Sequence, residues 1–191
     1  MWSKGQTLVE LVVVVTVIVM VIVALTFATI ASLRNSQFAK NQAQATKLAQ
    51  EGIERVRLGR DRNQPIISAG GLGDVTSWDG DSINPESSIW NYQIEGRCGD
   101  TSVTPPIFCY LNIDDQGVLH YLVASSTFPS SSAESIPPSP AKSLFSRAVI
   151  LSDDAATFNS GKTVTVVVRW TDFSGEHESR LKTILRNTKN P

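Results

Sequence analysis

The sequence predicts an α+β protein in which one long N-terminal helix packs on a C-terminal antiparallel sheet. Three observations favour this fold class. Residues 11–33 carry no charge, good helix formers continue without a proline as far as Pro65, and residues 163–170 alternate apolar and polar side chains as a strand does. A chain of 191 residues has room for an anchor and one domain of ordinary size.

The apolar run at residues 11–33 is long enough to cross a membrane. Apart from Ser32, its only polar residues are Thr16, Thr26 and Thr29, and each threonine hydroxyl can donate to a carbonyl one turn back. At about 1.5 Å per residue, a helix of this length spans a hydrocarbon core of about 30 Å. We therefore expect a membrane-spanning helix.

The helix should continue beyond the membrane as an amphipathic half, residues 34–62. Small and apolar residues recur at three- and four-residue spacing from Ala45 to Val56, with Gly52 on the same face. Such a narrow stripe of small side chains can lie close against a sheet. Gly59 or the polar run that follows it is the expected end of the helix.

Residues 63–191 are expected to form a globular sheet domain with two long loops. Residues 68–88 are rich in Gly, Ser and Asp, and residues 127–140 are rich in Ser and Pro, so both ranges are predicted to be loops, the second with little to bury. The predicted strands are residues 91–95, 107–113, 118–123, 144–151, 163–170 and 178–185. Residues 114–117 form the expected hairpin turn between the second and third of these strands.

The residues before the apolar run carry a further signal. Gly5, Thr7, Leu8 and Glu10 stand directly ahead of an uninterrupted apolar helix. A secretory signal peptide has a shorter apolar region with its small-residue cleavage site after it, whereas here the glycine comes first. This pattern resembles the class III leader of type IV pilins and type II secretion pseudopilins.

In that family a prepilin peptidase cuts after the glycine on the cytoplasmic side and methylates the new N-terminus. The resemblance therefore implies a leader of residues 1–5 and a mature chain that begins at Gln6, although the family more often begins with phenylalanine or methionine. It also implies that Glu10 meets the terminal amine of a neighbouring subunit during assembly, which would offset the desolvation of both charges. Residues 6–33 would then be both the transmembrane segment and the core of a filament.

The resemblance implies a pilin-like ladle fold and a single-pass protein of the cytoplasmic membrane, with its N-terminus in the cytoplasm and its globular domain outside, that later enters a pilus or pseudopilus. The implied partners are the prepilin peptidase, other pilin subunits, an inner-membrane assembly platform and membrane lipid. The stretch from Ala45 to Arg57 and the strand at 163–170 are similar to those of minor pilins of the PilV-like kind, which favours a minor subunit. The alternative is an ordinary signal anchor that carries a monomeric binding module.

Cys98 and Cys109 lie close together in the segment expected outside the cytoplasm, so a disulfide is the default expectation. Two free thiols or half of a metal site are the alternatives. With no histidine pair nearby, zinc is disfavoured.

The sequence gives little support to catalysis, cofactors or nucleic-acid binding. It has 17 basic and 18 acidic residues, without a long basic block. Neither His120 nor His177 has a recognisable nucleophile motif near it, so we expect a protein that is not an enzyme. Asp74, Asp79 and Asp81 are a possible calcium set, but they lack the EF-hand spacing and are typical of turns; we expect no cofactor and no metal.

Overall fold

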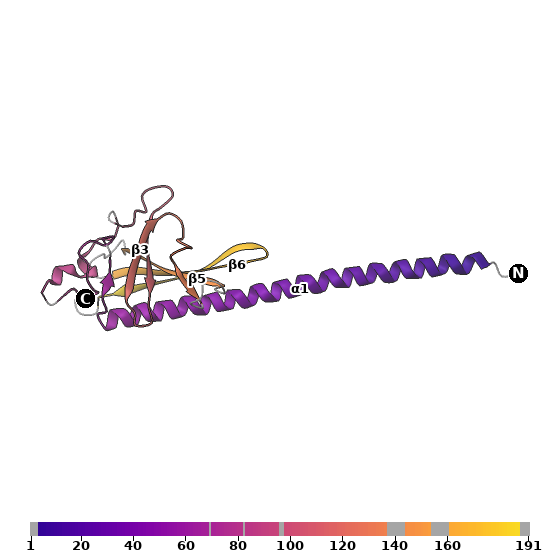
Figure 1. The fold of residues 1–191 in the computed structure, drawn as a ribbon, viewed down its shortest axis with the longest axis horizontal. Coiled ribbons are helices and arrows are strands. Elements are labelled where there is room, and N and C mark those ends of the chain that lie inside the picture. Colours follow the sequence, from indigo (N-terminus) through magenta and orange to yellow (C-terminus); the bar gives the residue numbers. More distant parts are fainter. Residues whose placement is uncertain are drawn as a thin grey trace. The chain divides into compact units, whose positions relative to one another are not determined.

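The computed structural model describes residues 4–68, 70–81, 83–95, 98–136, 144–153 and 161–187. The chain divides into two compact units, Met1–Asn41 and Gln42–Pro191. A single helix, α1 (Lys4–Asp61), begins in the first unit and ends in the second (Figure 1). The fold is α+β, as the sequence predicts.

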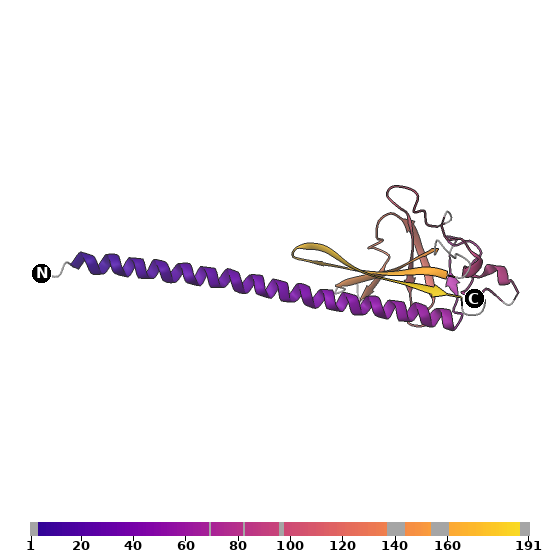
Figure 2. The ribbon, with the colours of Figure 1, turned by 180° about the vertical axis from the view of Figure 1, so that it is seen from behind.

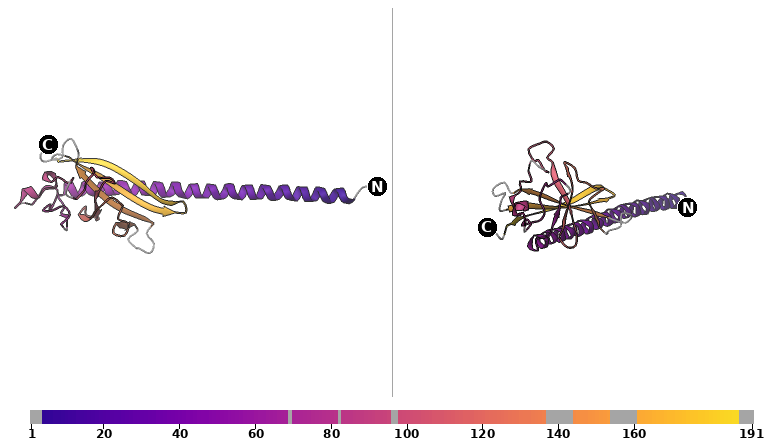
Figure 3. Two further views of the ribbon diagram at one scale, coloured as in Figure 1. Left: turned by 90° about the horizontal axis from the view of Figure 1, so that it is seen from above. Right: turned by 60° about the vertical axis from the view of Figure 1, so that its left-hand side comes forward.

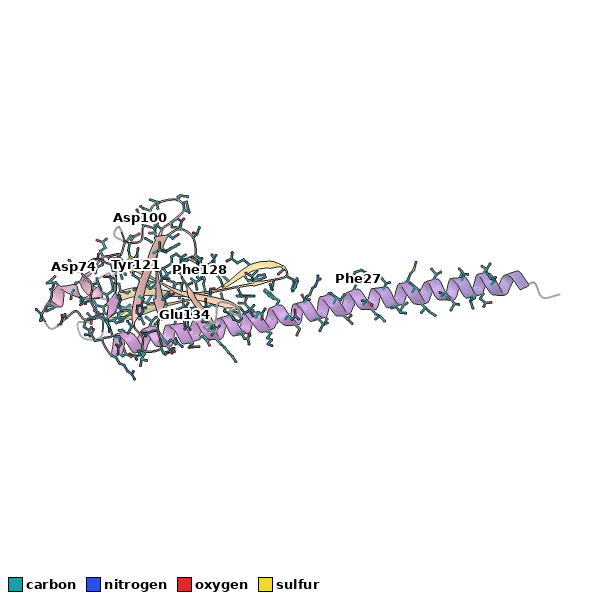
Figure 4. All side chains as sticks on the ribbon, viewed as in Figure 1. Phe27, Asp74, Asp100, Tyr121, Phe128 and Glu134 are labelled. Atoms are coloured by element: carbon teal, nitrogen blue, oxygen red, sulfur yellow. A yellow bond between two sulfur atoms is a disulfide. The ribbon has the colours of Figure 1, made fainter. Side chains whose placement is uncertain are left out.

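In the first unit, α1 is long and apolar enough to cross a membrane by length and composition. Every residue from Leu8 to Lys40 is exposed, and Figure 4 shows Phe27 projecting from the helix. The hydroxyls of Thr16, Thr26 and Thr29 donate to carbonyl oxygens three or four residues earlier, each at 2.8 Å. The expected return of these hydroxyls to the helix backbone is therefore confirmed.

The end of α1 also agrees with the sequence. The helix ends at Asp61, inside the polar run that follows Gly59. Asn63 has a positive φ of 48°, and the next residue, Gln64, donates its N–H to the Gly59 carbonyl at 2.8 Å. The left-handed conformation of Asn63 ends the helix and turns the chain toward the sheet.

The described residues form a seven-stranded sheet, in which β1, β3, β2, β5, β6 and β7 are neighbours in that order and β4 pairs with β5. All pairs are antiparallel except the short parallel pair of β1 and β3. Figure 2 shows the sheet from behind, and Figure 3 shows β6 and β7 side by side as a long hairpin. The strands are β1 (Ile66–Ile67), β2 (Phe108–Ile113), β3 (Leu119–Ser125), β4 (Glu134–Ile136), β5 (Phe145–Asp153), β6 (Gly161–Asp172) and β7 (Gly175–Arg186).

The C-terminal part of α1 packs on the sheet through the predicted stripe of small residues. Ala45, Ala49 and Val56 have no exposed surface. A Cβ atom on Gly52 would lie 2.8 Å from Cγ1 of Val166 in β6, so the missing side chain is what allows this close approach. The prediction that this face of the helix lies close against a sheet is confirmed.

The two faces of β6 bury different clusters, as its alternation predicts. Val164, Val166, Val168 and Trp170 belong to the main core beneath α1, whereas Val167 belongs to a second cluster on the opposite face. The sheet is therefore covered on both sides over part of its area. The second cluster consists of Tyr110, Phe128, Ala133, Ala148, Ile150 and Val167.

The second cluster corrects one sequence prediction, that residues 127–140 have little to bury. Phe128 is 6% exposed and Ala133 is 8% exposed, and the Phe128 ring packs edge-on against Tyr110. Residues 134–136 form β4, which pairs with β5. The rest of that predicted loop, residues 137–140, lies outside the described residues.

The loop predicted at residues 68–88 is irregular, as expected, but it is not a surface segment throughout. Leu72, Val75 and Trp78 are buried in the main core. The loop also contains a short 3-10 helix, η1 (Pro85–Ser87). Its Gly- and Ser-rich composition allows tight turns between these buried side chains.

The prediction of a strand at residues 91–95 is wrong. Residues Ile89–Asn91 form a 3-10 turn, η2, in which the Ser88 side chain accepts a hydrogen bond from the Trp90 N–H. Trp90 packs against Trp78 in the core, with ring centroids 5.5 Å apart. Capping and burial of Trp90 therefore override the local β propensity.

Replacing Gly52 with valine should destabilise the sheet domain. The new side chain would meet Val166, and overpacking of this kind costs about 1–3 kcal/mol of unfolding free energy. The measurement is denaturant unfolding of the full chain in detergent. Gln44→Val on the exposed face of the same helix is the matched control, and an equal loss in both variants would contradict the close contact.

Candidate functional site

The residues that the leader resemblance singles out lie at the start of α1. Gly5, Gln6 and Glu10 fall within its first two turns. The Glu10 side chain is exposed, next to the uncovered apolar surface of the helix. The structure thus places a single carboxylate at the entrance of an apolar segment, where an ionisable group is costly in lipid unless it finds a partner.

The apolar half of α1 is exposed around its whole circumference. Leu11, Met20 and Phe27 are 66%, 67% and 69% exposed, and the other large apolar side chains between residues 8 and 33 are also uncovered. Burial of apolar surface is worth about 25 cal/mol per Å², so a surface of this extent favours an apolar environment over water. Because no one face is polar, the helix has no side that prefers water.

Within the second unit, the buried guanidinium of Arg147, in β5, links α1 to the sheet. Its side chain is 1% exposed, and it forms a two-pronged ion pair with Glu134 in β4, with N–O distances of 2.8 and 2.9 Å. Its Nη1 donates to the Leu48 carbonyl of α1 at 3.1 Å. One side chain therefore joins the helix, β4 and β5, and its charge is compensated.

Arg55 extends this charged network along the helix. The spacing of Glu51 and Arg55 predicts an i, i+4 ion pair on the solvent side, and the pair is present at 2.6 Å. However, the Arg55 side chain is only 22% exposed, because it also reaches Asp115 at 2.7 Å and Glu134 at 3.7 Å. The expectation of a purely solvent-facing pair is therefore wrong, since Arg55 faces the sheet and its β2–β3 turn.

The β2–β3 turn meets α1 backbone to backbone. A Cβ atom on Gly59 would collide with the carbonyl oxygen of Gly117, and Gly117 has a positive φ of 87°. Asp114 shapes the turn by accepting N–H bonds from Gln116 and Val118, both at 2.9 Å. The predicted hairpin turn at residues 114–117 is confirmed, and it also fixes the end of the helix.

A second buried ion pair lies at the other end of the sheet domain. Lys162 has no exposed surface, and its Nζ contacts Asp153 Oδ1 at 2.5 Å and the Tyr92 carbonyl at 2.6 Å. Desolvation lowers the pKa of Lys162 from its ordinary value, and the bond to Asp153 opposes that shift. Asp153 Oδ2 accepts the N–H of Glu95 at 2.9 Å, so this pair also anchors the start of the cysteine loop.

Cys98 and Cys109 form a disulfide, with Cα atoms 5.3 Å apart. Both cysteines are buried. The expected disulfide is confirmed, and the alternatives of free thiols or half a metal site do not apply. The bond ties the loop between the two cysteines to β2, while residues 101–105 of that loop are exposed.

The two histidines lie where the sequence places them, one inside a strand and one beside a hairpin turn. His120, in β3, lies 3.7 Å from Asp114. His177, in β7, is stacked on Trp170, and its Nε2 lies 2.9 Å from both Asp172 Oδ1 and Ser174 Oγ.

This cluster at the β6–β7 turn differs from a catalytic triad. In a triad the serine and the aspartate bond to different ring nitrogens, whereas here a single nitrogen of His177 meets both. The Ser174 hydroxyl donates to Asp172 at 2.7 Å and holds the pKa of that carboxyl below its ordinary value, burial opposes this shift, and His177 adds to it. The arrangement fits a hydrogen-bonded turn.

Asp79, one of the three aspartates considered for calcium, has a partner for its carboxylate, and the backbone N–H groups of Asp79 and Asp81 are also hydrogen-bonded. Asp79 accepts from Trp90 Nε1 at 3.2 Å, and the Asp79 N–H donates to Asn63 at 2.7 Å. The Asp81 N–H donates to the Ser87 hydroxyl at 3.2 Å. Within the described ranges, no three His, Cys, Asp or Glu side chains gather as a metal site.

Sequence reasoning missed the two buried cations, Arg147 and Lys162. The signal that was available is a single charge inside an otherwise apolar strand, as in the run from Leu144 to Leu151. A charge in such a position requires a buried partner. The partner cannot be predicted from the sequence, because Glu134 lies 13 residues before Arg147 and no spacing pattern connects the two.

The chain thus offers an uncovered apolar helix in its first unit and, in its second, a sheet domain fixed by two buried ion pairs and a disulfide. Comparisons with protein-family models, with curated proteins and with solved structures found no match.

Replacing Glu134 with glutamine should strongly destabilise the second unit. The change removes the two-pronged partner of the buried Arg147 guanidinium and leaves only the half-exposed Glu51 carboxylate, at 3.6 Å. Loss of a buried ion-pair partner typically costs about 3–5 kcal/mol. Denaturant unfolding of the full chain in detergent, followed by tryptophan fluorescence, measures this loss.

The matched control is Glu54→Gln, which removes an exposed i, i+3 partner of Arg57 and should cost less than about 1 kcal/mol. Similar losses in the two variants would show that the Arg147 pair contributes no more than a surface pair.

Proposed function

We propose that this chain is a structural subunit, of the minor kind, of a type IV pilus or a related pseudopilus. The observation that carries the proposal is the uncovered apolar surface of α1 from Leu8 to Leu33. Such a helix requires an apolar environment, and both a membrane and a bundle of like helices supply one. By this proposal, the apolar part of α1 lies in the membrane before assembly and in the filament core after it.

The exchange of lipid for neighbouring helices explains why the helix lacks a polar face. Lipid tails are about as apolar as leucine side chains, so the transfer changes apolar burial little. The free energy of transfer is then small, and an assembly ATPase at an inner-membrane platform can drive it. By this proposal, the sheet domain stays outside the cytoplasmic membrane throughout. Its two buried ion pairs and its disulfide keep it folded while the helix moves.

The leader residues supply the first step. We infer that a prepilin peptidase cuts between Gly5 and Gln6 and methylates the amine of Gln6. Cleavage removes Lys4, the cation before the apolar run, and places a terminal amine four residues before Glu10. The carboxylate of one subunit then meets the amine of the next, which offsets the desolvation of both groups and fixes their axial register.

Processing is tested on the protein from its native membrane, with and without the peptidase. Intact-mass and N-terminal analysis should find a chain that begins at Gln6 and carries an N-methyl group when the peptidase is active. The chain should begin at Met1 in cells without the peptidase, and also in a Gly5→Val variant. A chain that begins at Met1 despite an active peptidase would instead favour an anchored, monomeric binding module.

The role of Glu10 is tested by Glu10→Ala. We expect the variant to be processed and inserted in the membrane but to enter sheared filaments at least about tenfold less, since an uncompensated terminal amine costs more than 1.4 kcal/mol in an apolar core. Glu54→Ala, which removes an exposed carboxylate further along α1, is the control. Normal incorporation of the Glu10 variant into filaments would contradict the proposed pairing of Glu10 with the terminal amine.

A further inference from the structure

A cavity of about 240 Å³ lies between the cysteine loop and the ends of β2 and β5. For comparison, an apolar cavity of about 150 Å³ is large enough to take benzene. The cavity is therefore of a size for one small organic group. Its wall combines apolar side chains, a glycine backbone and several oxygen-bearing side chains.

The floor of the cavity is apolar and rigid. Ile94 and Leu151 belong to the main core and are almost fully buried, and Ile107 stands beside them in the wall. Cys109 also lines the cavity, and its disulfide to Cys98 holds the wall in place. An apolar body of a few carbon atoms can lie against this floor and remove its surface from water.

The rim of the cavity carries two carboxylates, from Glu95 and Asp153. The Asp153 side chain is 6% exposed, and its charge is compensated by Lys162 at 2.5 Å. Glu95 accepts a hydrogen bond from the Thr101 hydroxyl, and it forms no ion pair with a described residue. The rim therefore has one more negative than positive charge among the described side chains.

We propose that this cavity binds a primary ammonium group carried on a short apolar body. The ammonium would bond to the Glu95 carboxylate at the rim, and the apolar body would lie on the floor formed by Ile94, Ile107 and Leu151. An anion would face two carboxylates, and a neutral ligand of the same shape would leave Glu95 without a cation. The cavity is built within the second unit alone, so this inference is independent of the proposed filament role.

The test uses benzylamine as the probe and benzyl alcohol as its neutral match in size and shape. Each is titrated into the isotopically labelled full chain in detergent micelles, and the amide signals of Gly99 and Thr101, both in the cavity wall, are followed by NMR. Benzylamine should shift these signals saturably, with an affinity about fivefold higher than that of benzyl alcohol, as expected for an ion pair with an exposed carboxylate. Equal binding of the two probes would overturn the proposal.

Glu95→Gln is the decisive variant, because its side chain is exposed and only one oxygen is replaced. Benzylamine should bind it about fivefold more weakly. Glu86→Gln replaces an exposed carboxylate that does not line the cavity, and this variant should bind benzylamine as the parent chain does. Unchanged binding to Glu95→Gln would also overturn the proposal.

Arg97 is adjacent in sequence and lies outside the described residues, so Arg97→Ala is tested in parallel. If benzylamine binds only to that variant, the chain fills its own cavity with a guanidinium, and the proposal is wrong.

Discussion

The sheet domain depends on the pairing of one buried guanidinium. Arg147 is removed from water almost completely, and a charge in that position is tolerated only if its hydrogen bonds and its charge are both satisfied. Glu134 supplies the carboxylate, and Leu48 in α1 supplies a carbonyl. Because the partners come from two elements, β4 and α1, and Arg147 lies in a third, β5, the requirement to satisfy Arg147 favours one placement of α1 and β4 on β5. Few arrangements of the chain can meet that requirement, so the buried pair specifies the packing as well as contributing to its stability.

The guanidinium reaches the helix because the helix lies unusually close. Gly52 has no side chain to hold α1 away from Val166, and the alanines on the same face keep the gap small along the stripe. At the end of the helix, Gly59 and Gly117 bring two backbones into contact in the same way. Packing and electrostatics thus reinforce each other here. A larger residue at Gly52 would move the helix outward and would also lengthen the hydrogen bond from Arg147 to the Leu48 carbonyl.

Residue spacing and residue type were enough to predict several parts of the fold. The end of α1, its stripe of small residues, the two faces of β6, the 114–117 turn and the disulfide all follow from spacing and residue type. The sequence did not predict β4, because a three-residue strand inside a serine- and proline-rich segment has little propensity of its own and exists through its pairing with β5. The same reason explains the wrong strand at 91–95, where burial of Trp90 decides the structure. The partners of Arg147 and Lys162 could not be predicted either, because they lie between 9 and 99 positions away in the sequence, where no local spacing pattern links them.

A change in solvation along α1 connects these observations to function. Between residues 42 and 61 the helix has a narrow apolar stripe that fits one partner, the sheet, and polar residues elsewhere. Between residues 8 and 33 it has no such preference, since large apolar side chains cover its whole circumference. A helix with one apolar face is committed to one neighbour, but a helix that is apolar all round can exchange one apolar environment for another at little cost. The two parts of α1 therefore differ in what they can contact: the second is committed to the sheet domain, and, under the proposed function, the first exchanges lipid for other helices.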